Sequence, residues 1–280
     1  MVFMCLMAWQ FSSAQRGYYS ISGTPGLMYY IGDMSGDFPD TKTTHFCFGL
    51  DFGYTRGGIF KYTLGYQYGK ISGADSLIGN SDFRNLHFFS TVHDIRLLAY
   101  IDLRKIWMKI KPRKTVGRAD WEPGFTGPNL ILGLGFFNFN PQGELDGEKF
   151  DLQKLGTEGQ HISGGDYPTP YSLWAFNLKY GAGIGYNVSR QVNLELQLLY
   201  YKTFTDYLDD VSTEYPNYNE LIKSDNGDIT SYFTYGGKDG SKVQEGKPRG
   251  NSAKNDGIVT LGLKVTYTFG RSEFTRIMNL

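Results

Sequence analysis

The stretch that most constrains the fold runs from Thr44 to Gly69, where apolar residues alternate with small or polar ones on both sides of Arg56-Gly57-Gly58. Successive strand side chains point to opposite faces, so each arm has one apolar face. We interpret the two arms as a β-hairpin. A three-residue loop from Arg56 to Gly58 keeps like faces together by placing Tyr54 opposite Phe60, whereas a two-residue turn does not. The apolar positions are Phe46, Phe48, Leu50, Phe52, Tyr54, Phe60, Tyr62, Leu64, Tyr66 and Tyr68.

The opposite face of this hairpin indicates its environment. It consists of glycine and other small residues interleaved with Asp51, Lys61 and Gln67, which suits a narrow lumen, while the largely aromatic face suits contact with lipid. The 21 Tyr, 20 Phe and 36 Gly of the 280 residues are also typical of a membrane barrel. The alternative is a soluble β-sandwich, but its strands are usually shorter and less aromatic.

The same alternation recurs along the chain and predicts an all-β fold, an eight-stranded antiparallel transmembrane β-barrel with long outer loops. Pro25-Gly26 predicts a bulge in the first strand, because proline cannot donate to the ladder. In the fourth strand the apolar parity changes near His93, which predicts a bulge between Val92 and Ile95. Besides the two hairpin arms, the expected strands are Tyr18–Ile31, Leu86–Asp102, Asn129–Asn140, Ser172–Tyr186, Val192–Tyr200 and Val259–Phe269.

The two ends of the expected barrel differ in their connections. An even strand number returns both termini to one side, and the short turns near Arg56 and Ser189 lie on that side too. Short turns face the periplasm in outer-membrane barrels, so a basic insertion from Leu103 to Gly127 is expected there. The expected divisions are a signal peptide at residues 1–14, a barrel at residues 15–270 and a periplasmic tail at residues 271–280.

The signal peptide is inferred from the apolar run Val2–Trp9, which is too short to span a membrane as a helix. Ser12-Ser13-Ala14 follows, and cleavage is expected after Ala14. A positively charged segment before the run is missing, and the alternative is a buried N-terminal strand. Cleavage leaves Cys47 as the only cysteine, a small side chain in the lumen without a disulfide partner.

Charged residues on the inward faces balance in number and sign. Ions in a narrow lumen must be paired, so a matched network that plugs the barrel is favoured over an open pore. This hypothesis makes a passive channel the less favoured function. The predicted interior network is Asp51, Asp94, Asp102 and Glu195 against Lys61, Arg96, Lys179 and Lys264.

The insertion after the fourth strand is strongly basic and contains no acidic residue between Leu103 and Asp120. It is either a solvated loop that contacts lipid head groups or a docking surface for the acidic face of a periplasmic protein. Trp107 and Trp121 are candidate anchors, since interfaces favour tryptophan and arginine. The candidate partner-binding residues are Arg104, Lys105, Trp107, Lys109, Lys111, Arg113, Lys114, Arg118 and Trp121.

Motifs for chemistry are lacking. The formal net charge is zero, which gives no argument for nucleic-acid binding, and no nucleophile, zinc-hydrolase or phosphate-loop pattern occurs. We therefore expect no enzyme, no cofactor and no metal centre. The acids Asp206, Asp209, Asp210 and Glu214 could supply calcium ligands, but they lack EF-hand spacing and acidic loop edges are commonly only solvated.

Several loop-edge segments resemble the PorG-like outer-membrane barrels associated with the type IX secretion system. The resemblance covers essentially the whole mature chain, although Leu103–Gly127 and Arg271–Leu280 look expanded relative to the usual pattern. It implies a barrel that attaches the periplasmic ring of that machinery to the outer membrane. The segments are Tyr30–Asp33, Gly69–Ser76, Arg84–Leu86, Phe139–Pro141, Leu152–Gln160 (LQKLGTEGQ) and Thr203–Ser212 (TFTDYLDDVS).

The sequence thus predicts an integral outer-membrane barrel with a structural or accessory role in secretion. Its expected partners are outer-membrane lipid and periplasmic secretion-ring proteins. Two alternatives are a small passive channel and a surface adhesin or ligand-binding barrel that uses the loops at residues 141–170 and 206–256.

Overall fold

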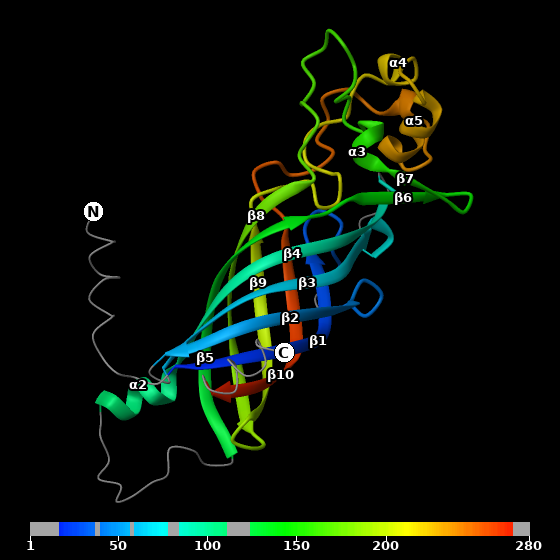
Figure 1. The fold of residues 1–280 in the computed structure, drawn as a ribbon. Coiled ribbons are helices and arrows are strands. Elements are labelled where there is room, and N and C mark those ends of the chain that lie inside the picture. The colour runs from blue at the N-terminus through cyan, green and yellow to red at the C-terminus, as the bar shows by residue number, and fades with distance from the viewer. Residues whose placement is uncertain (1–16, 37–39, 57–58, 78–83, 111–123, 271–280) are drawn as a thin grey trace, which may run out of the picture.

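A computed structural model of the chain describes residues 17–36, 40–56, 59–77, 84–110 and 124–270 (Figure 1). Within these residues eight long strands pair antiparallel in a ring. β3 pairs with β4 as well as with β2, and β1 pairs with β10, so the barrel is closed. The eight strands are β1 (Tyr18–Ile31), β2 (His45–Arg56), β3 (Phe60–Ala74), β4 (His87–Asp102), β5 (Gly124–Asn138), β8 (Trp174–Asn187), β9 (Val192–Thr203) and β10 (Gly257–Gly270).

Four long connections of the barrel gather at one end, the loop end, whereas the two short turns and the β4–β5 connection lie at the other, the turn end (Figure 1). At the loop end β6 pairs with β4 and continues into β7. The helix α2 (Leu103–Ile110) lies at the turn end, directly after β4. No helix among the described residues is both long and apolar enough to cross a membrane. The loop-end elements are η2 (Asp75–Leu77), β6 (Pro141–Leu145), β7 (Glu148–Asp151), α3 (Leu152–Leu155), α4 (Tyr218–Leu221), α5 (Gly227–Tyr235) and η3 (Gly240–Lys242).

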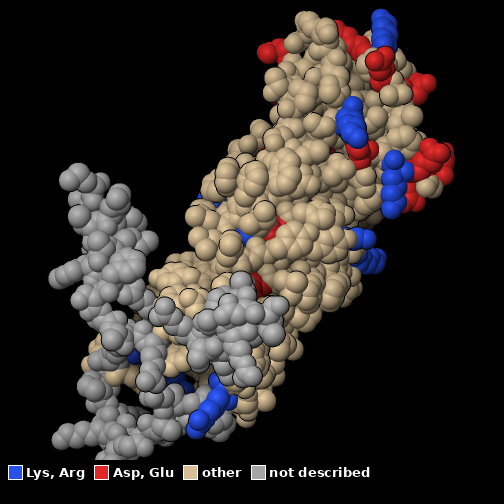
Figure 2. Space-filling view, viewed as in Figure 1, with Lys and Arg blue, Asp and Glu red and all other residues tan. Residues whose placement is uncertain are grey.

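The outer face of the barrel wall is apolar, and on the face drawn in Figure 2 charged side chains gather mainly at the two ends. Aliphatic side chains such as Leu64, Leu134 and Leu198 are exposed around the middle. Aromatic side chains form a girdle close to each end, as in barrels that span a bilayer. The girdle at the turn end consists of Tyr18, Phe60, Tyr62, Phe125, Tyr186 and Tyr267, all exposed.

The predicted eight-stranded barrel is confirmed, and the outward faces of the first hairpin are those expected. The register of that hairpin was predicted wrongly by two residues. Tyr54 pairs with Tyr62 and Arg56 with Phe60, whereas the prediction placed Tyr54 opposite Phe60. A shift of two residues keeps every side chain on its face, so hydrophobic alternation alone cannot distinguish the two registers.

Both predicted bulges are absent. The β1–β10 pairing lapses at Thr24 and Pro25 and resumes in the same register at Gly26, so the missing proline N–H interrupts the ladder without shifting it. The β3–β4 register is continuous past His93. A register shift occurs instead in β5, between Thr126 and Pro128.

The interior changes character along the barrel axis, which explains the apparent change of parity in β4. Phe88 and Val92 point inward at the loop end, as do Asp94 and Arg96 further along the strand. Even positions therefore face inward throughout. The inward apolar side chains belong to a core that continues under the loops and includes Tyr30, Met34, Ile71, Phe137, Phe139, Leu208 and Val211.

Part of the predicted organisation lies outside the described residues. This applies to the signal peptide at residues 1–14 and to the tail at residues 271–280. In the basic insertion, Lys111, Arg113, Lys114, Arg118 and Trp121 also lie outside them. Lys109 belongs to α2 by its backbone, and its side chain is not described.

Candidate functional site

The interior charges converge on Asp51, a buried residue of β2. Arg96 of β4 donates to both carboxylate oxygens, from Nε to Oδ1 at 2.9 Å and from Nη2 to Oδ2 at 3.1 Å. Lys264 of β10 donates to Oδ2 from the other side, at 3.1 Å. Asp51 therefore holds two buried cations, and such an arrangement is favourable in a low-dielectric interior only while all three groups are present.

Hydrogen bonds of this network cross the whole lumen. The Lys264 ammonium donates to the hydroxyl of Tyr100 at 2.6 Å, and the Tyr201 hydroxyl donates to Gln67 Oε1 at 2.5 Å. In the eight-strand ring β10 lies opposite β4, and β9 lies opposite β3. Side chains of opposite walls meet, so the lumen is filled at this level, as the diameter of an eight-stranded barrel allows.

The other predicted interior charges lie at or near this network, with one exception. Lys179 of β8 binds Asp94 of β4 at 3.0 Å, and both are buried. Glu195 is buried and is the cross-strand neighbour of Lys264. Lys61 Nζ lies 3.4 Å from the Thr266 hydroxyl.

Asp102 is the exception and corrects the predicted set. It ends β4, where its Oδ1 accepts a hydrogen bond from the backbone N–H of Lys105 at 2.9 Å. Its other oxygen lies 3.4 Å from the Lys105 ammonium, whose side chain is half exposed. The inward parity of Asp102 is right, but the strand ends there, so the carboxylate caps the start of α2 instead of entering the lumen.

A second buried polar cluster, the loop-end cluster, joins the long connections around Glu158 and Arg249. Arg249 Nη1 donates to Glu158 Oε1 at 3.0 Å, and Arg249 Nη2 lies 3.6 Å from Asp210 Oδ2. Glu158 also accepts from the backbone N–H of Ser212 at 2.9 Å, and Asp210 accepts from the Tyr171 hydroxyl at 2.7 Å. These contacts tie residues 157–160, 207–213 and 249 into one unit.

Two carboxyl groups of the loop-end cluster share one hydroxyl. The Tyr30 hydroxyl hydrogen-bonds Asp209 Oδ2 and lies 3.1 Å from Asp256 Oδ1. Burial raises the pKa of Asp209 to about 8, and burial next to Asp209 raises the pKa of Asp256 well above its usual range. Because one hydroxyl donates to only one acceptor, the second contact is a hydrogen bond when a carboxyl group carries a proton.

The acids considered for calcium do not converge. Asp209 is bound to Tyr30 and Asp210 to Tyr171, while Glu214 is exposed and forms an isolated β-bridge with Pro248. No group of three or more possible metal ligands occurs in the part of the chain that the structure describes. Burial raises the pKa of Asp206 to about 7, which also disfavours its ionised, metal-binding form.

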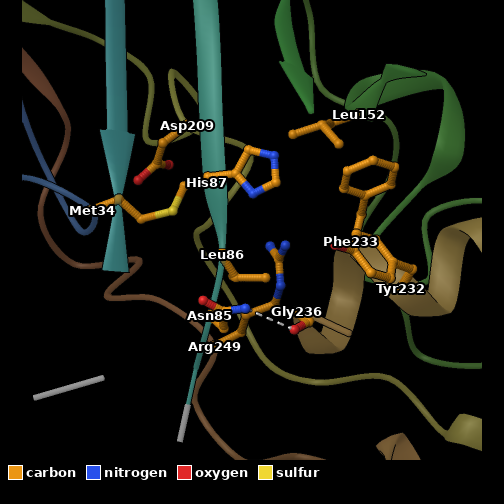
Figure 3. A pocket seen from close by; sticks show the side chains of 10 residues that line it. All are labelled: Met34, Asn85, Leu86, His87, Leu152, Asp209, Tyr232, Phe233, Gly236 and Arg249. Carbon is orange, nitrogen blue, oxygen red and sulfur yellow. Dashed lines mark hydrogen bonds between the residues drawn. The ribbon is translucent and has the colours of Figure 1, made fainter. Parts of the chain in front are cut away.

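A small hollow and an open groove lie among the described residues of the loop end. One, under the loops, holds about 10 Å³, room for one water, and is lined by Met34, Leu86, Phe233 and others (Figure 3). Asn85 closes one side of it through a hydrogen bond to the Gly236 carbonyl at 3.3 Å. The other is an open groove of about 680 Å³, lined by residues that include Asp166, Tyr167, Glu214, Tyr215, Pro216, Glu245 and Asn251.

Sequence reasoning missed Tyr30, Glu158 and Arg249 as members of a buried site. A partial indication of the site was present in the sequence, because Tyr30, Glu158 and Asp209 all fall within the segments for which a resemblance to PorG-like barrels was noted. Arg249 lies outside those segments, and nothing in its local sequence marks it as buried.

No family model matches the chain, and no curated protein matches it. Neisserial surface protein A is similar at 11% identity and a TM-score of 0.40, covering 90% of this chain and 97% of that one. Ail of Yersinia pestis, solved with the heparin analogue sucrose octasulfate, is 10% identical with a TM-score of 0.37, over 92% and 100%. The N-terminal β-barrel domain of Pseudomonas aeruginosa OprF is 12% identical with a TM-score of 0.32, over 91% and 100%. The barrel fold rests on the strand pairing described above.

Proposed function

We propose that this protein is an outer-membrane barrel with a structural or accessory role in type IX secretion, holding a periplasmic ring complex at the membrane. The observation that carries the proposal is the filled lumen, in which Lys264 meets Tyr100 and Tyr201 meets Gln67 across the barrel. A barrel filled by paired charges suits anchoring better than passage of solutes, because opening a path would separate buried ions.

The link to type IX secretion rests on the resemblance to PorG-like barrels. The segments that carry it are distant in sequence but meet in the loop-end cluster. Tyr30 of the first segment hydrogen-bonds Asp209 of the last, and Glu158 of a third accepts from Ser212. Because residues of three of these segments contact one another, the segments belong to one structural unit, which supports a genuine resemblance over a set of chance matches.

Partner binding is assigned to the turn end, which faces the periplasm in the proposed orientation. The basic insertion starts there, and its cations suit an acidic face on a ring protein. Among its described members, Arg104 and Lys105 are exposed. Lys109 belongs to α2 by its backbone, and Lys111, Arg113, Lys114, Arg118 and Trp121 follow the helix in the sequence.

Charge reversal tests this proposal. The variant Lys109→Glu, Lys111→Glu, Arg113→Glu and Lys114→Glu is expected to lose co-purification of the ring proteins from native membranes while its folded barrel still migrates apart from boiled protein on an SDS gel. A matched control reverses four exposed lysines of the loop end, Lys238, Lys242, Lys247 and Lys254. Recovery of ring proteins at wild-type yield by the first variant would refute the proposal.

A second candidate function is ligand binding at the cell surface, which the open groove at the loop end favours. The groove has the volume of a small-ligand site and combines Tyr167 with the carboxylates of Asp166 and Glu245. Screening the purified barrel against glycans and peptides, with Tyr167→Ala as the control, tests it. Binding that Tyr167→Ala weakens supports this function, and absence of any binding removes it.

A further inference from the structure

The helix α2 is amphipathic and keeps its apolar side exposed. Leu103, Ile106, Trp107 and Ile110 follow the i, i+3, i+4, i+7 spacing that places side chains on one helix face, the α2 stripe. Leu103, Trp107 and Ile110 are 41%, 60% and 69% exposed. Arg104 and Lys105 lie off this stripe, as does Lys109 by its position in the sequence.

The start of α2 is fixed beside the aromatic girdle of the turn end. Arg104 Nη1 donates to the backbone carbonyl of Phe125 in β5 at 2.8 Å. A Cβ atom placed on Gly127 would lie only 2.2 Å from Arg104 Cβ, so the helix rests directly against that strand. Phe125 is 70% exposed and makes an edge contact with Tyr186, at 5.3 Å between ring centroids. The α2 stripe therefore begins level with side chains that face lipid.

We propose that α2 lies on the bilayer surface at the turn end, with its stripe at the boundary between acyl chains and head groups and its cations at phospholipid phosphates. Helices with a large apolar face and basic residues on the other faces bind membranes in this way. At about 1.5 Å per residue the helix is about 12 Å long, so all of it stays close to the girdle. The stripe begins at Leu103, the residue directly after β4, and Arg104 and Lys105 match anionic phosphates in charge.

A lipid surface is favoured over a protein as the occupant because the barrel that carries α2 is itself embedded in lipid. Water would leave the α2 stripe exposed beside a bilayer able to cover it. The inference goes beyond the proposed secretion role, since it concerns the bilayer and needs no partner protein. It also gives the basic insertion a fixed starting direction along the membrane surface.

Fluorescence of Trp107 tests the inference in vesicles of pure phospholipid. The variant Trp9→Phe, Trp121→Phe and Trp174→Phe keeps Trp107 as the only tryptophan and is reconstituted into phosphatidylcholine vesicles with or without phosphatidylglycerol. We expect a blue-shifted emission, loss of intensity in lipids brominated near the head group, and shielding from iodide. Replacing Ile110 by Ser in this variant should reduce the quenching by lipid, because it removes part of the stripe.

A matched control keeps only Trp174, a lipid-facing residue at the other girdle, and confirms with the heat-dependent gel shift that the barrel is folded. If Trp174 is quenched by brominated lipid while Trp107 emits as in water and is fully open to iodide, the inference is wrong. The α2 stripe would then be exposed to water in lipid alone and available to a partner protein, and the secretion proposal would be unaffected.

Discussion

Asp51 is the residue whose loss should cost the barrel most. Replacing it by Asn leaves the Arg96 and Lys264 cations buried without their counter-charge, which typically destabilises by about 3–5 kcal/mol. The free energy of unfolding is measured by urea titration in lipid vesicles, with loss of the heat-dependent gel shift as the readout. The control is Asp102→Asn, which disrupts a partly exposed pair with Lys105 and should cost about 0–1 kcal/mol. Equal effects of the two substitutions would contradict the buried network.

The shared hydroxyl of Tyr30 predicts a pH dependence at the loop end. The ordinary carboxyl pKa is 3.8, whereas in the folded protein the pKa of Asp209 is about 8 and that of Asp256 is also raised. Between the ordinary and the raised pKa values the folded state holds protons that the unfolded state has released, so stability falls as pH rises from about 4 through the pKa of Asp209 at about 8.

The loss of stability is measured by amide hydrogen exchange of residues 206–212, corrected for the pH dependence of the intrinsic exchange rates. The protection of these amides should fall as pH rises. Asp209→Asn imitates the protonated group and should flatten the dependence. A variant with the wild-type slope, or protection that grows with pH in the wild type, would show that these carboxyl groups are not the cause.

At the scale of elements, the alternation of side chains in the membrane was predictable because lipid requires an apolar outer face on every strand. The prediction from alternation failed at the loop end, where Phe88 and Val92 point inward to an apolar core. An apolar residue there no longer marks the outer face of the barrel. The helices and the β6–β7 hairpin of the long loops were missed, because they are short and pack on that core instead of following a long period of their own.

The candidate site was predictable only as a set of residues. Inward parity selected the charges of the lumen, but the pairing of Lys264 with Asp51 and Tyr100 depends on how strands are staggered around the closed ring. Glu158 and Arg249 are 91 residues apart and lie in loops, where no periodicity connects them.

The loop-end cluster should behave as an element separable from the barrel. Arg249→Met leaves the buried carboxylates of Glu158 and Asp210 without their cation, at a cost of about 3–5 kcal/mol to the loops. Limited proteolysis should then cleave within residues 206–256, while the heat-dependent gel shift persists because the barrel ladder is untouched. Lys242→Met, which removes an exposed pair with Asp239, is the control and should leave cleavage unchanged. Simultaneous loss of the gel shift would mean that loops and barrel unfold as one unit.

The interior of the molecule as a whole has two parts, one charged and one apolar, along the axis of the closed barrel. Within the apolar wall the lumen holds paired charges, and toward the loop end it becomes an apolar core covered by ordered connections. The turn end instead carries α2 and the basic insertion. The proposed partner site and the proposed membrane helix lie at the turn end, and the open groove of the second candidate function lies at the loop end.

Electrical recording across planar lipid bilayers decides whether the lumen is closed. Purified protein, shown to be folded by its heat-dependent gel shift, should insert without producing stable conductance steps, because hydrogen bonds from Lys264 to Tyr100 and from Tyr201 to Gln67 cross the lumen. Large, stable conductance from the wild-type protein would contradict the filled lumen and favour a passive channel.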